Sequence, residues 1–438
     1  MRFVPTLLVF FLALAANAQE YVPSEDNLQA RKDFSSERFG IFLHWGIYSS
    51  YAQGEWYLNV GKLNKDEYAK AAGSFYPSQF NADEWVKAFK DAGAGYITIT
   101  SRHHDGFSMF NSSATDYDIV DATPYGHDVM SDLDKACQKE GLKLHFYYSL
   151  VDWIREDYPI GEFGRLTGRK GDRQDYGHYF DFMKCQIKEL LTNYNTSALW
   201  LDGYWDHDKD ESPFDWRIRE LYDHIHTINP ACLIGNNHHR MPLEGEDFVM
   251  YEDDLPGENK NGLSGGQKII DTLPMETCQT MNNSWGYEVK DLDYRPVGDL
   301  IKQLATCVSM NCNLLLNIGP RADGSLPEGA LKCLKGIGEW MRLNGESIKG
   351  CGYGPVGKSD WGVTTAPAGD PKTFYIHVFK HPGDAIEIPI PQKSRIKNAI
   401  ALADGSEISA RKNGDKLIVN LADDLSTDSD YVIKVSLR

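Results

Sequence analysis

The chain lacks two features that would direct it to a membrane or to a nucleic acid. Beyond its first residues it has no apolar stretch long enough for a transmembrane helix, which needs about 20 residues. It also lacks an excess of basic residues, since 45 lysines and arginines stand against 63 aspartates and glutamates and the formal net charge is −18. An acidic surface repels phosphate backbones and anionic lipids. We therefore expect no nucleic-acid partner and no membrane insertion, and a neutral ligand is favoured.

Cysteine motifs for zinc are missing as well. The eight cysteines are irregularly spaced, without a C-x-x-C pair and without a cluster of cysteine and histidine. Several lie inside helical or strand patterns, so we expect mostly buried thiols, with one or more disulfides as the alternative. Hydrophobic residues make up 42% of the chain, which is enough for a large core. The sequence predicts a globular protein without a metal ion or cofactor.

A short apolar run lies at the very start of the chain. Arg2 precedes the apolar residues 7–15, and Ala16-Asn17-Ala18 follows as an A-x-A cleavage site. The run is too short to span a bilayer, and no cysteine follows it that could carry a lipid anchor. Residues 1–18 are therefore predicted to be a signal peptide cleaved after Ala18, and the mature protein is expected to be secreted or periplasmic.

Strand-like and helix-like segments alternate from residue 80 to about residue 345. The strand-like segments are apolar throughout, so both of their faces are expected to be buried, as in parallel strands covered by helices. These segments are residues 41–44, 96–100, 144–150, 198–202, 232–235 and 314–319. The helical patterns between them are residues 82–92, 127–140, 176–194, 216–227 and 297–310.

This alternation predicts an α/β fold, a (β/α)₈-like barrel over residues 19–348. A doubly wound sheet is the alternative, but no glycine-rich turn of the nucleotide-binding kind follows the first strand. After Gly350 the pattern changes to short alternating strands separated by turns, and these predict a small antiparallel β-sandwich over residues 352–438. The expected strands of the sandwich are residues 374–379, 385–390, 416–421 and 431–435.

Polar and aromatic residues gather at the carboxyl ends of the predicted barrel strands, where barrels carry their chemistry. A metal centre is one interpretation of the histidines among them, but the first strand carries no H-x-H pair. Tyrosine, tryptophan and histidine favour a sugar site instead, because they stack on sugar rings and bind hydroxyls. The strand-end residues are His44, Trp45, His103, His104, Tyr147, Tyr148, Asp202, Tyr204, Trp205, Asn236, Asn237, His238, His239, Arg240 and Asn317.

Asp202 is the candidate nucleophile at this edge. It follows four apolar residues, and Gly203 lets the chain turn directly after it. Hydrolysis of a glycoside generally needs two carboxylic acids, one on each side of the bond that breaks. On position alone, an aspartate that caps the next helix is the alternative interpretation.

The second carboxyl group is harder to place. An acid catalyst needs a raised pKa and therefore apolar neighbours. Glu252, which follows Val249-Met250-Tyr251, meets this requirement better than Glu244 or Glu246. Glu258 and Glu276 remain alternatives.

Several motifs together resemble those of the retaining α-L-fucosidases, glycoside hydrolase family 29. They occur in the family's order over about residues 30–345, and the set is far more specific than any one of them. The motifs are Arg38 to Ser49 (RFGIFLHWGIYS), Glu55-Trp56-Tyr57, His103-His104-Asp105-Gly106-Phe107, Tyr147-Tyr148-Ser149-Leu150, Leu199-Trp200-Leu201-Asp202-Gly203, Ser284-Trp285-Gly286-Tyr287 and Asn317 to Gly324 (NIGPRADG).

The resemblance implies a catalytic barrel followed by a β-sandwich, with Asp202 as the nucleophile. Glu252 matches the usual place of the acid/base, Glu258 stays in contention, and Glu276 matches a carboxylate taken as structural. Arg240 falls in the family's arginine position near the site, and Trp285 is our candidate for contact with the sugar's methyl group. The residues implied to line the fucose pocket are His44, Trp56, His103, His104 and Tyr148.

The expected reaction is the release of terminal α-L-fucose from a fucosylated oligosaccharide or glycoconjugate by double displacement, with net retention. A related sugar such as α-L-galactose is one alternative substrate, and a non-catalytic fucose-binding protein on the same scaffold is another alternative. The sequence leaves open whether the chain forms a homo-oligomer.

Overall fold

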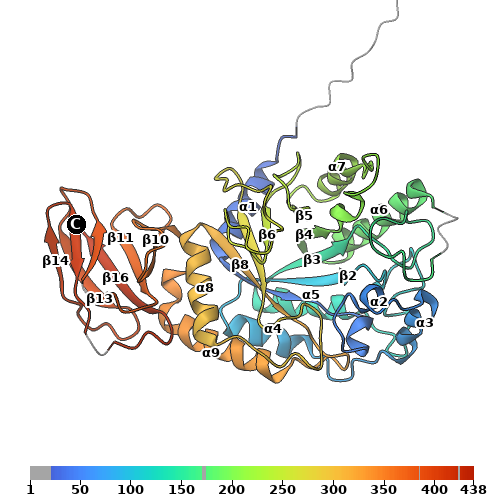
Figure 1. The fold of residues 1–438 in the computed structure, drawn as a ribbon, viewed down its shortest axis with the longest axis horizontal. Coiled ribbons are helices and arrows are strands. Elements are labelled where there is room, and N and C mark those ends of the chain that lie inside the picture. The colour runs from blue at the N-terminus through green and yellow to red at the C-terminus, as the bar shows by residue number, and fades with distance from the viewer. Residues whose placement is uncertain (1–20, 170–173, 384, 423–424) are drawn as a thin grey trace, which may run out of the picture.

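Eight parallel strands form a nearly closed barrel in the computed structural model, which describes residues 21–169, 174–383, 385–422 and 425–438 (Figure 1). The predicted signal peptide, residues 1–18, lies outside the described residues. The strands follow the order β5-β4-β3-β2-β1-β8-β7-β6, so β5 and β6 stand at the two ends of the ladder. The strands are β1 (Phe39–Leu43), β2 (Tyr96–Arg102), β3 (Lys143–Ser149), β4 (Thr196–Asp202), β5 (Leu233–Asn237), β6 (Val249–Glu252), β7 (Met275–Thr280) and β8 (Cys312–Ile318).

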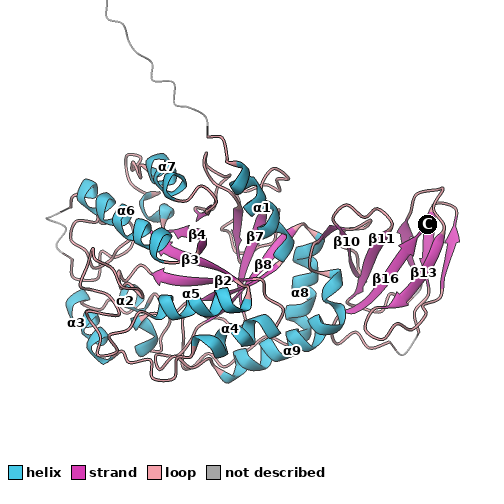
Figure 2. Cartoon of the chain, turned by 180° about the vertical axis from the view of Figure 1, so that it is seen from behind, coloured by secondary structure: helices cyan, strands magenta, loops and turns pink. Residues whose placement is uncertain are grey.

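Helices cover the outer face of the barrel, and Figure 2 shows α4, α5 and α9 packed along it. The five predicted helices are all present, with ends within two residues of the expected ones. They are α4 (Ala82–Asp91), α5 (Val129–Glu140), α6 (Tyr176–Asn193), α7 (Ile218–Ile228) and α8 (Val297–Ser309). The structure adds α1 (Glu25–Glu37), the short α2 (Tyr57–Val60) and α3 (Lys65–Ala69), and α9 (Glu328–Asn344).

Side chains of the barrel strands point alternately inward and outward, as strand geometry requires. Inward residues such as Phe42, Tyr147 and Trp200 fill the barrel. Their neighbours in the sequence pack against the helices in the main core. Phe34 of α1 lies with the inward set and contacts the rings of Tyr96 and Phe248, so α1 covers the end of the barrel where the strands begin.

The C-terminal part consists of antiparallel strands in two sheets, which confirms the predicted fold class. One sheet has the order β13-β16-β11-β10-β9 and the other the order β12-β15-β14, and a separate apolar core lies between them. Helix α8 contacts β9 and β10, so the last barrel helices adjoin this unit (Figure 1). The strands are β9 (Cys351–Tyr353), β10 (Gly362–Pro367), β11 (Thr373–Val378), β12 (Ile386–Pro389), β13 (Ile396–Ala401), β14 (Ala410–Asn413), β15 (Lys416–Val419) and β16 (Tyr431–Leu437).

All eight cysteines are described, and each is a free thiol. Seven are buried, and Cys185 is the exposed one. The expectation of mostly buried thiols is confirmed.

Candidate active site

A pocket of about 740 Å³ opens at the carboxyl ends of the barrel strands. Its lining carries mainly aromatic, histidine and carboxylate side chains. The lining residues are Phe42, His44, Glu55, Trp56, His103, His104, Tyr147, Glu162, Phe163, Trp200, Asp202, Trp205, Asp208, Lys209, Asn237, His239, Glu252, Gly262, Leu263, Cys278 and Trp285.

Asp202 is the last residue of β4, and its carboxylate is held by three donors. The Tyr147 hydroxyl donates to Oδ2 at 2.8 Å, and the Trp205 indole donates to Oδ1 at 3.1 Å. The Asn237 amide donates to Oδ1 at 3.3 Å. Only 8% of Asp202 is exposed, so the carboxylate is fixed in a largely dry site.

Glu252 ends β6 and faces the same pocket. Its Oε2 accepts a hydrogen bond of 2.7 Å from the Asn237 amide and lies 3.1 Å from Nε2 of His239. One nitrogen of Asn237 therefore bonds both carboxylates, at 3.3 Å to Asp202 and 2.7 Å to Glu252. Such a bridge favours the close carboxyl spacing of about 5–5.5 Å used in covalent double displacement over the ~6.5–9.5 Å that leaves room for a direct attack by water.

The two carboxyl groups have opposite pKa shifts. Burial, together with the negative charge of Glu252, raises the pKa of Asp202 to about 6, although the hydrogen bond from Tyr147 opposes the rise. Burial also works against ionisation of Glu252, but the hydrogen bond and charge of His239 outweigh it and lower the pKa of that carboxyl. The raised pKa expected of an acid catalyst is therefore not found on Glu252 itself, because the sequence did not show that His239 pairs with it. The same contact raises the pKa of His239 although burial opposes it.

His44 is held in one tautomer by its neighbours. Its Nδ1 lies 2.7 Å from Oδ1 of Asn317, whose own amide donates to the Trp285 carbonyl. An amide oxygen can only accept, so Nδ1 of His44 carries a hydrogen. Burial lowers the pKa of His44 to about 4, so the ring is neutral at pH 7. Its Nε2 is therefore a hydrogen-bond acceptor.

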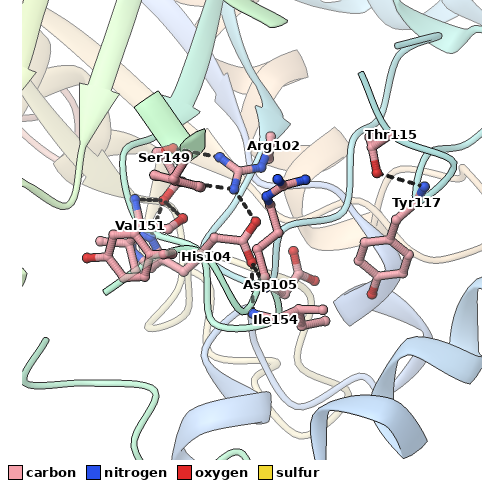
Figure 3. Close-up of polar contacts among 12 residues, drawn as sticks. Arg102, His104, Asp105, Thr115, Tyr117, Ser149, Val151 and Ile154 are labelled. Atoms are coloured by element: carbon pink, nitrogen blue, oxygen red, sulfur yellow. Dashed lines mark hydrogen bonds and ion pairs between the residues drawn. The ribbon is translucent and has the colours of Figure 1, made fainter. Parts of the chain in front are cut away.

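His104 is fixed in the same way, as Figure 3 shows at the ends of β2 and β3. The Ser149 hydroxyl donates to the Val151 carbonyl at 2.8 Å, so it accepts from Nδ1 of His104 at 2.7 Å. Burial lowers the pKa of His104 to about 3. Its Nε2, which lies 3.5 Å from Oδ2 of Asp202, is thus a second acceptor beside the nucleophile candidate.

A buried ion pair supports this part of the wall. Arg102 ends β2, pairs with Asp152 and donates to the Ser149 carbonyl at 2.9 Å (Figure 3). It thereby joins the end of β2 to the loop that follows β3. His103, the next residue, lines the pocket and stacks on Tyr147 with 5.2 Å between ring centroids.

Aromatic rings complete the walls. Trp56 stacks on Trp205 with 5.8 Å between centroids, and it meets His104 edge to face. Trp285 lies against the rings of His44 and Phe42. Both predicted tryptophans therefore lie at the pocket.

The prediction that Tyr148 lines the pocket is wrong. Tyr147 points into the barrel, so Tyr148 points outward to the helices, where its hydroxyl donates to Gln186 of α6. Its ring packs beside Arg102. Tyr147 is the tyrosine that reaches Asp202, and the apolar sequence of this strand did not reveal which of the two faces inward.

The predicted contact of Arg240 with the site is also not present. Its side chain is about half exposed, forms an ion pair with Asp208 and lies over the ring of Tyr204. Asp208 lines the pocket, whereas Arg240 does not. The preceding residue, His239, lines the pocket instead.

The rival carboxyl groups lie elsewhere. Glu258 forms ion pairs with Lys260 and Lys358 and lines a different cavity. Glu276 is buried inside the barrel, where it accepts hydrogen bonds from Tyr96 at 2.6 Å and Trp200 at 3.0 Å. Among the three candidates, Glu252 is the one that lines the pocket with Asp202.

Sequence reasoning placed Tyr147, Trp205, Asn237 and His239 at strand ends but gave them no individual role in the site, and it gave none to Glu55. Glu55 is buried and accepts a hydrogen bond of 2.7 Å from the Gly286 amide, and burial raises its pKa. The sequence showed that Asn237 ends its strand, as Asp202 does, but the pairing of the two residues is seen only in the structure. Over the described ranges, no group of three or more histidine, cysteine or acidic side chains is arranged to hold a metal ion.

Comparisons with known proteins agree in pointing to one family. Residues 8–346 match the family profile described as Alpha-L-fucosidase. An α-L-fucosidase from Dictyostelium discoideum is 28% identical over 424 residues, which cover 87% of this chain and 86% of the relative. The human plasma α-L-fucosidase is 28% identical over 371 residues, 76% of this chain and 73% of the relative.

Solved structures give the same result. The α-L-fucosidase isoenzyme 1 from Paenibacillus thiaminolyticus is 35% identical, with a TM-score of 0.83, over 94% of this chain and 100% of that chain. An α-L-fucosidase from Bacteroides thetaiotaomicron, trapped as a covalent intermediate with 2-fluoro-fucosyl fluoride, is 28% identical, with a TM-score of 0.79, over 94% of this chain and 96% of that chain.

Proposed function

The chain belongs to the α-L-fucosidase family of glycoside hydrolases, and from this premise we propose that Asp202 and Glu252 release a terminal α-L-fucose by double displacement. The observation that carries this assignment is the Asn237 amide, which bonds both carboxylates at once. The covalent intermediate of the Bacteroides relative supports the same reaction class here.

In the first step Asp202 attacks the anomeric carbon while Glu252 protonates the departing glycosidic oxygen. The C–O bond breaks with its electron pair going to that oxygen, and a fucosyl ester of Asp202 forms. The donors Tyr147, Trp205 and Asn237 hold the carboxylate in position for this attack.

In the second step Glu252 removes a proton from water. The resulting hydroxide adds to the anomeric carbon, and Asp202 leaves as a carboxylate, so the configuration of the sugar is retained. In both steps Glu252 transfers the proton, while the bond to the sugar is formed and then broken at Asp202.

We assign the recognition of sugar hydroxyls to His44 and His104. Each presents a neutral Nε2 acceptor, so each suits a hydroxyl that donates. Phe42, Trp200 and Trp285 supply the apolar part of the wall, and we place the 6-methyl group of fucose there. Because a hydroxymethyl group would lose hydrogen bonds on that surface, this arrangement favours fucose over α-L-galactose.

The natural partner proposed is a fucosylated oligosaccharide or glycoconjugate. No helix of the described ranges is long and apolar enough to cross a membrane. From residues 1–18 alone we propose that the protein is secreted or exported to a periplasm. We also propose that the rest of the chain divides into a barrel domain of residues 19–348 and a sandwich domain of residues 352–438.

A trapping experiment tests the mechanism directly. The protein is incubated with 2-deoxy-2-fluoro-α-L-fucosyl fluoride and digested with a protease. The masses of its peptides are then measured by mass spectrometry. We expect a fluorofucosyl adduct on Asp202, and proton NMR of a normal aryl α-L-fucoside should show the α-anomer of fucose as the first product. An adduct on another residue, or the β-anomer as first product, would contradict the assignment.

A further inference from the structure

His239 lies where the barrel ladder is interrupted. In the described chain β5 and β6 are the two end strands and share no register pairs, so side chains join them at the pocket. His239 follows β5 by two residues, and its Nε2 lies 3.1 Å from Oε2 of Glu252 on β6. Its backbone has φ 58°, in the left-handed region that non-glycine residues seldom adopt. Such a conformation, at a residue that lines the pocket, points to a functional constraint.

The hydrogen bonds of Glu252 divide its two oxygens. Oε2 accepts from the Asn237 amide at 2.7 Å, and an amide nitrogen can only donate. Oε2 also contacts His239, and in the described structure both bonds of this carboxyl go to that oxygen. The arrangement leaves Oε1 as the oxygen to meet the glycosidic bond.

Above the neutral-ring, carboxylate state, the imidazole and the carboxyl group can together hold one exchangeable proton. Either His239 is an imidazolium beside a carboxylate, or it is a neutral ring beside a carboxylic acid. The two forms contain the same number of protons. Because Nε2 keeps its hydrogen toward Oε2 in both forms, the proton that moves leaves Nδ1 of the ring and reaches Oε1 of Glu252, so the transfer passes through water and not along the 3.1 Å contact.

Negatively charged groups around the pair stabilise its protonated state. Glu252, Asp202 and Asp208 all face His239 with negative charge, and they raise the pKa of its ring against the effect of burial. The titratable groups that face Glu252 besides His239 are Asp202, His44, Glu55, Asp253, Tyr147 and Cys278. Arg240, the nearest arginine in the sequence, is engaged by Asp208.

We propose that His239 is a positioning residue that shares the acid proton with Glu252, so that the pair acts as the general acid and base of the proposed reaction. In the first step the pair loses its proton from Glu252 to the leaving oxygen, and His239 ends as a neutral ring that donates its Nε2 hydrogen to Oε2. In the second step Glu252 takes a proton from water, and the pair returns to its starting state as Asp202 departs. This inference rests on the proposed function.

His239→Gln tests the pair, because a glutamine amide can donate a hydrogen bond but cannot hold an extra proton. The measurement is kcat/KM against pH for phenyl and 2-chloro-4-nitrophenyl α-L-fucosides, which have a poor and a good leaving group. We expect the alkaline limit to fall by about one pH unit or more, since a carboxyl group then titrates in place of an imidazole. We also expect the phenyl substrate to lose about 10- to 100-fold and the activated substrate to lose only a few-fold, because general acid catalysis matters most for poor leaving groups.

The matched control is His178→Gln. His178 is exposed and pairs with Asp157 at 2.6 Å, outside the pocket, so its loss removes an imidazole–carboxylate pair of the same kind. The control should keep the pH profile of the unchanged protein. If His239→Gln is active with an unchanged alkaline limit and an unchanged ratio of the two substrates, the inference is wrong. If the unchanged protein hydrolyses neither fucoside, the proposed function fails, and the inference fails with it.

A second measurement uses the unchanged protein and does not depend on a variant that folds. The enthalpy of ionisation of an imidazolium is much larger than that of a carboxyl group, so its pKa falls more on warming. An alkaline limit set by the pair should therefore move to lower pH as the temperature rises. A limit that stays constant with temperature would identify a carboxyl group acting alone and would overturn the shared proton.

Discussion

The two catalytic carboxyl groups proposed here are supported in different ways. Asp202 ends β4, which pairs with β3 on one side and β5 on the other, so backbone ladders fix it from both directions. Glu252 ends β6, which pairs with β7 alone and stands at the end of the sheet order. Side chains of β5 and the loop after it, Asn237 and His239, supply the support that is missing on its other side.

This difference suits the two proposed tasks. A nucleophile must be held at a fixed place and needs little else, and a ladder on both sides achieves that. An acid and base must exchange a proton in each half of the reaction, so its neighbours must tolerate both of its charge states. The imidazole of His239 can gain or lose a proton and so adapts to both charge states of Glu252, whereas a ladder of backbone hydrogen bonds cannot.

Asp202→Asn should have the largest effect. The amide keeps the shape of the side chain but cannot form the ester, so we expect kcat to fall on the order of 10⁴-fold or more. An aryl α-L-fucoside assay measures the loss, and circular dichroism checks that the variant is folded. Near-normal turnover would remove Asp202 from the role of nucleophile.

Glu252→Ala should rank second. General acid–base catalysis contributes about 10²- to 10⁴-fold, so kcat/KM for phenyl α-L-fucoside should fall by that order. Azide should rescue turnover of an activated substrate and give α-L-fucosyl azide, because it attacks the fucosyl ester of Asp202 from the face that water would use and needs no base. Glu258→Ala is the matched control, since Glu258 is bound by two lysines outside the pocket. Rescue in that control, and not in Glu252→Ala, would exchange the two assignments.

Substitutions of Tyr147 and Tyr148 test how the Asp202 carboxylate is held. Tyr147→Phe removes a donor from the Asp202 carboxylate, and a hydrogen bond to a charged group is worth about 1.5–3 kcal/mol, so activity should fall about 10- to 100-fold. Tyr148→Phe should leave activity near normal and lower the free energy of unfolding by about 1 kcal/mol, because its hydroxyl bonds Gln186 and does not reach Asp202. Steady-state kinetics and denaturant unfolding separate the two outcomes, and equal losses of activity would contradict the inward and outward assignment.

The acid limit of activity should belong to Asp202. The nucleophile must be ionised to attack, and burial raises its pKa to about 6, so kcat/KM should decline as the pH falls below that value. Tyr147→Phe should move this limit to higher pH, since the lost hydrogen bond stabilises the ionised form. A limit that stays in place in this variant would assign it to another group.

The sequence was sufficient for the parts that depend on local pattern. Asp202 follows an apolar strand, and both the strand and its charged end are visible in the sequence. Strands β6 and β7 were not predicted, because residues 249–252 run into an acidic loop and residues 275–280 are largely polar. The roles of Asn237 and His239 depend on the gap between β5 and β6, which no local pattern reveals.

Glu276→Gln should have the smallest effect on activity, within about threefold, because Glu276 lies inside the barrel and bonds only Tyr96 and Trp200.

The effect of Glu276→Gln on stability is a separate prediction. Burial raises the pKa of Glu276 from 4.5 to about 7. The folded state therefore binds this proton more tightly than the unfolded state, so the free energy of unfolding falls as the pH rises from the lower to the higher value, by about 2–3 kcal/mol. Glutamine does not ionise, so the variant should lose less stability over this range in denaturant unfolding at several pH values. An identical slope would show that Glu276 keeps an ordinary pKa, whereas a large loss of activity would mean that the carboxyl groups inside the barrel take part in the reaction as well as those at its mouth.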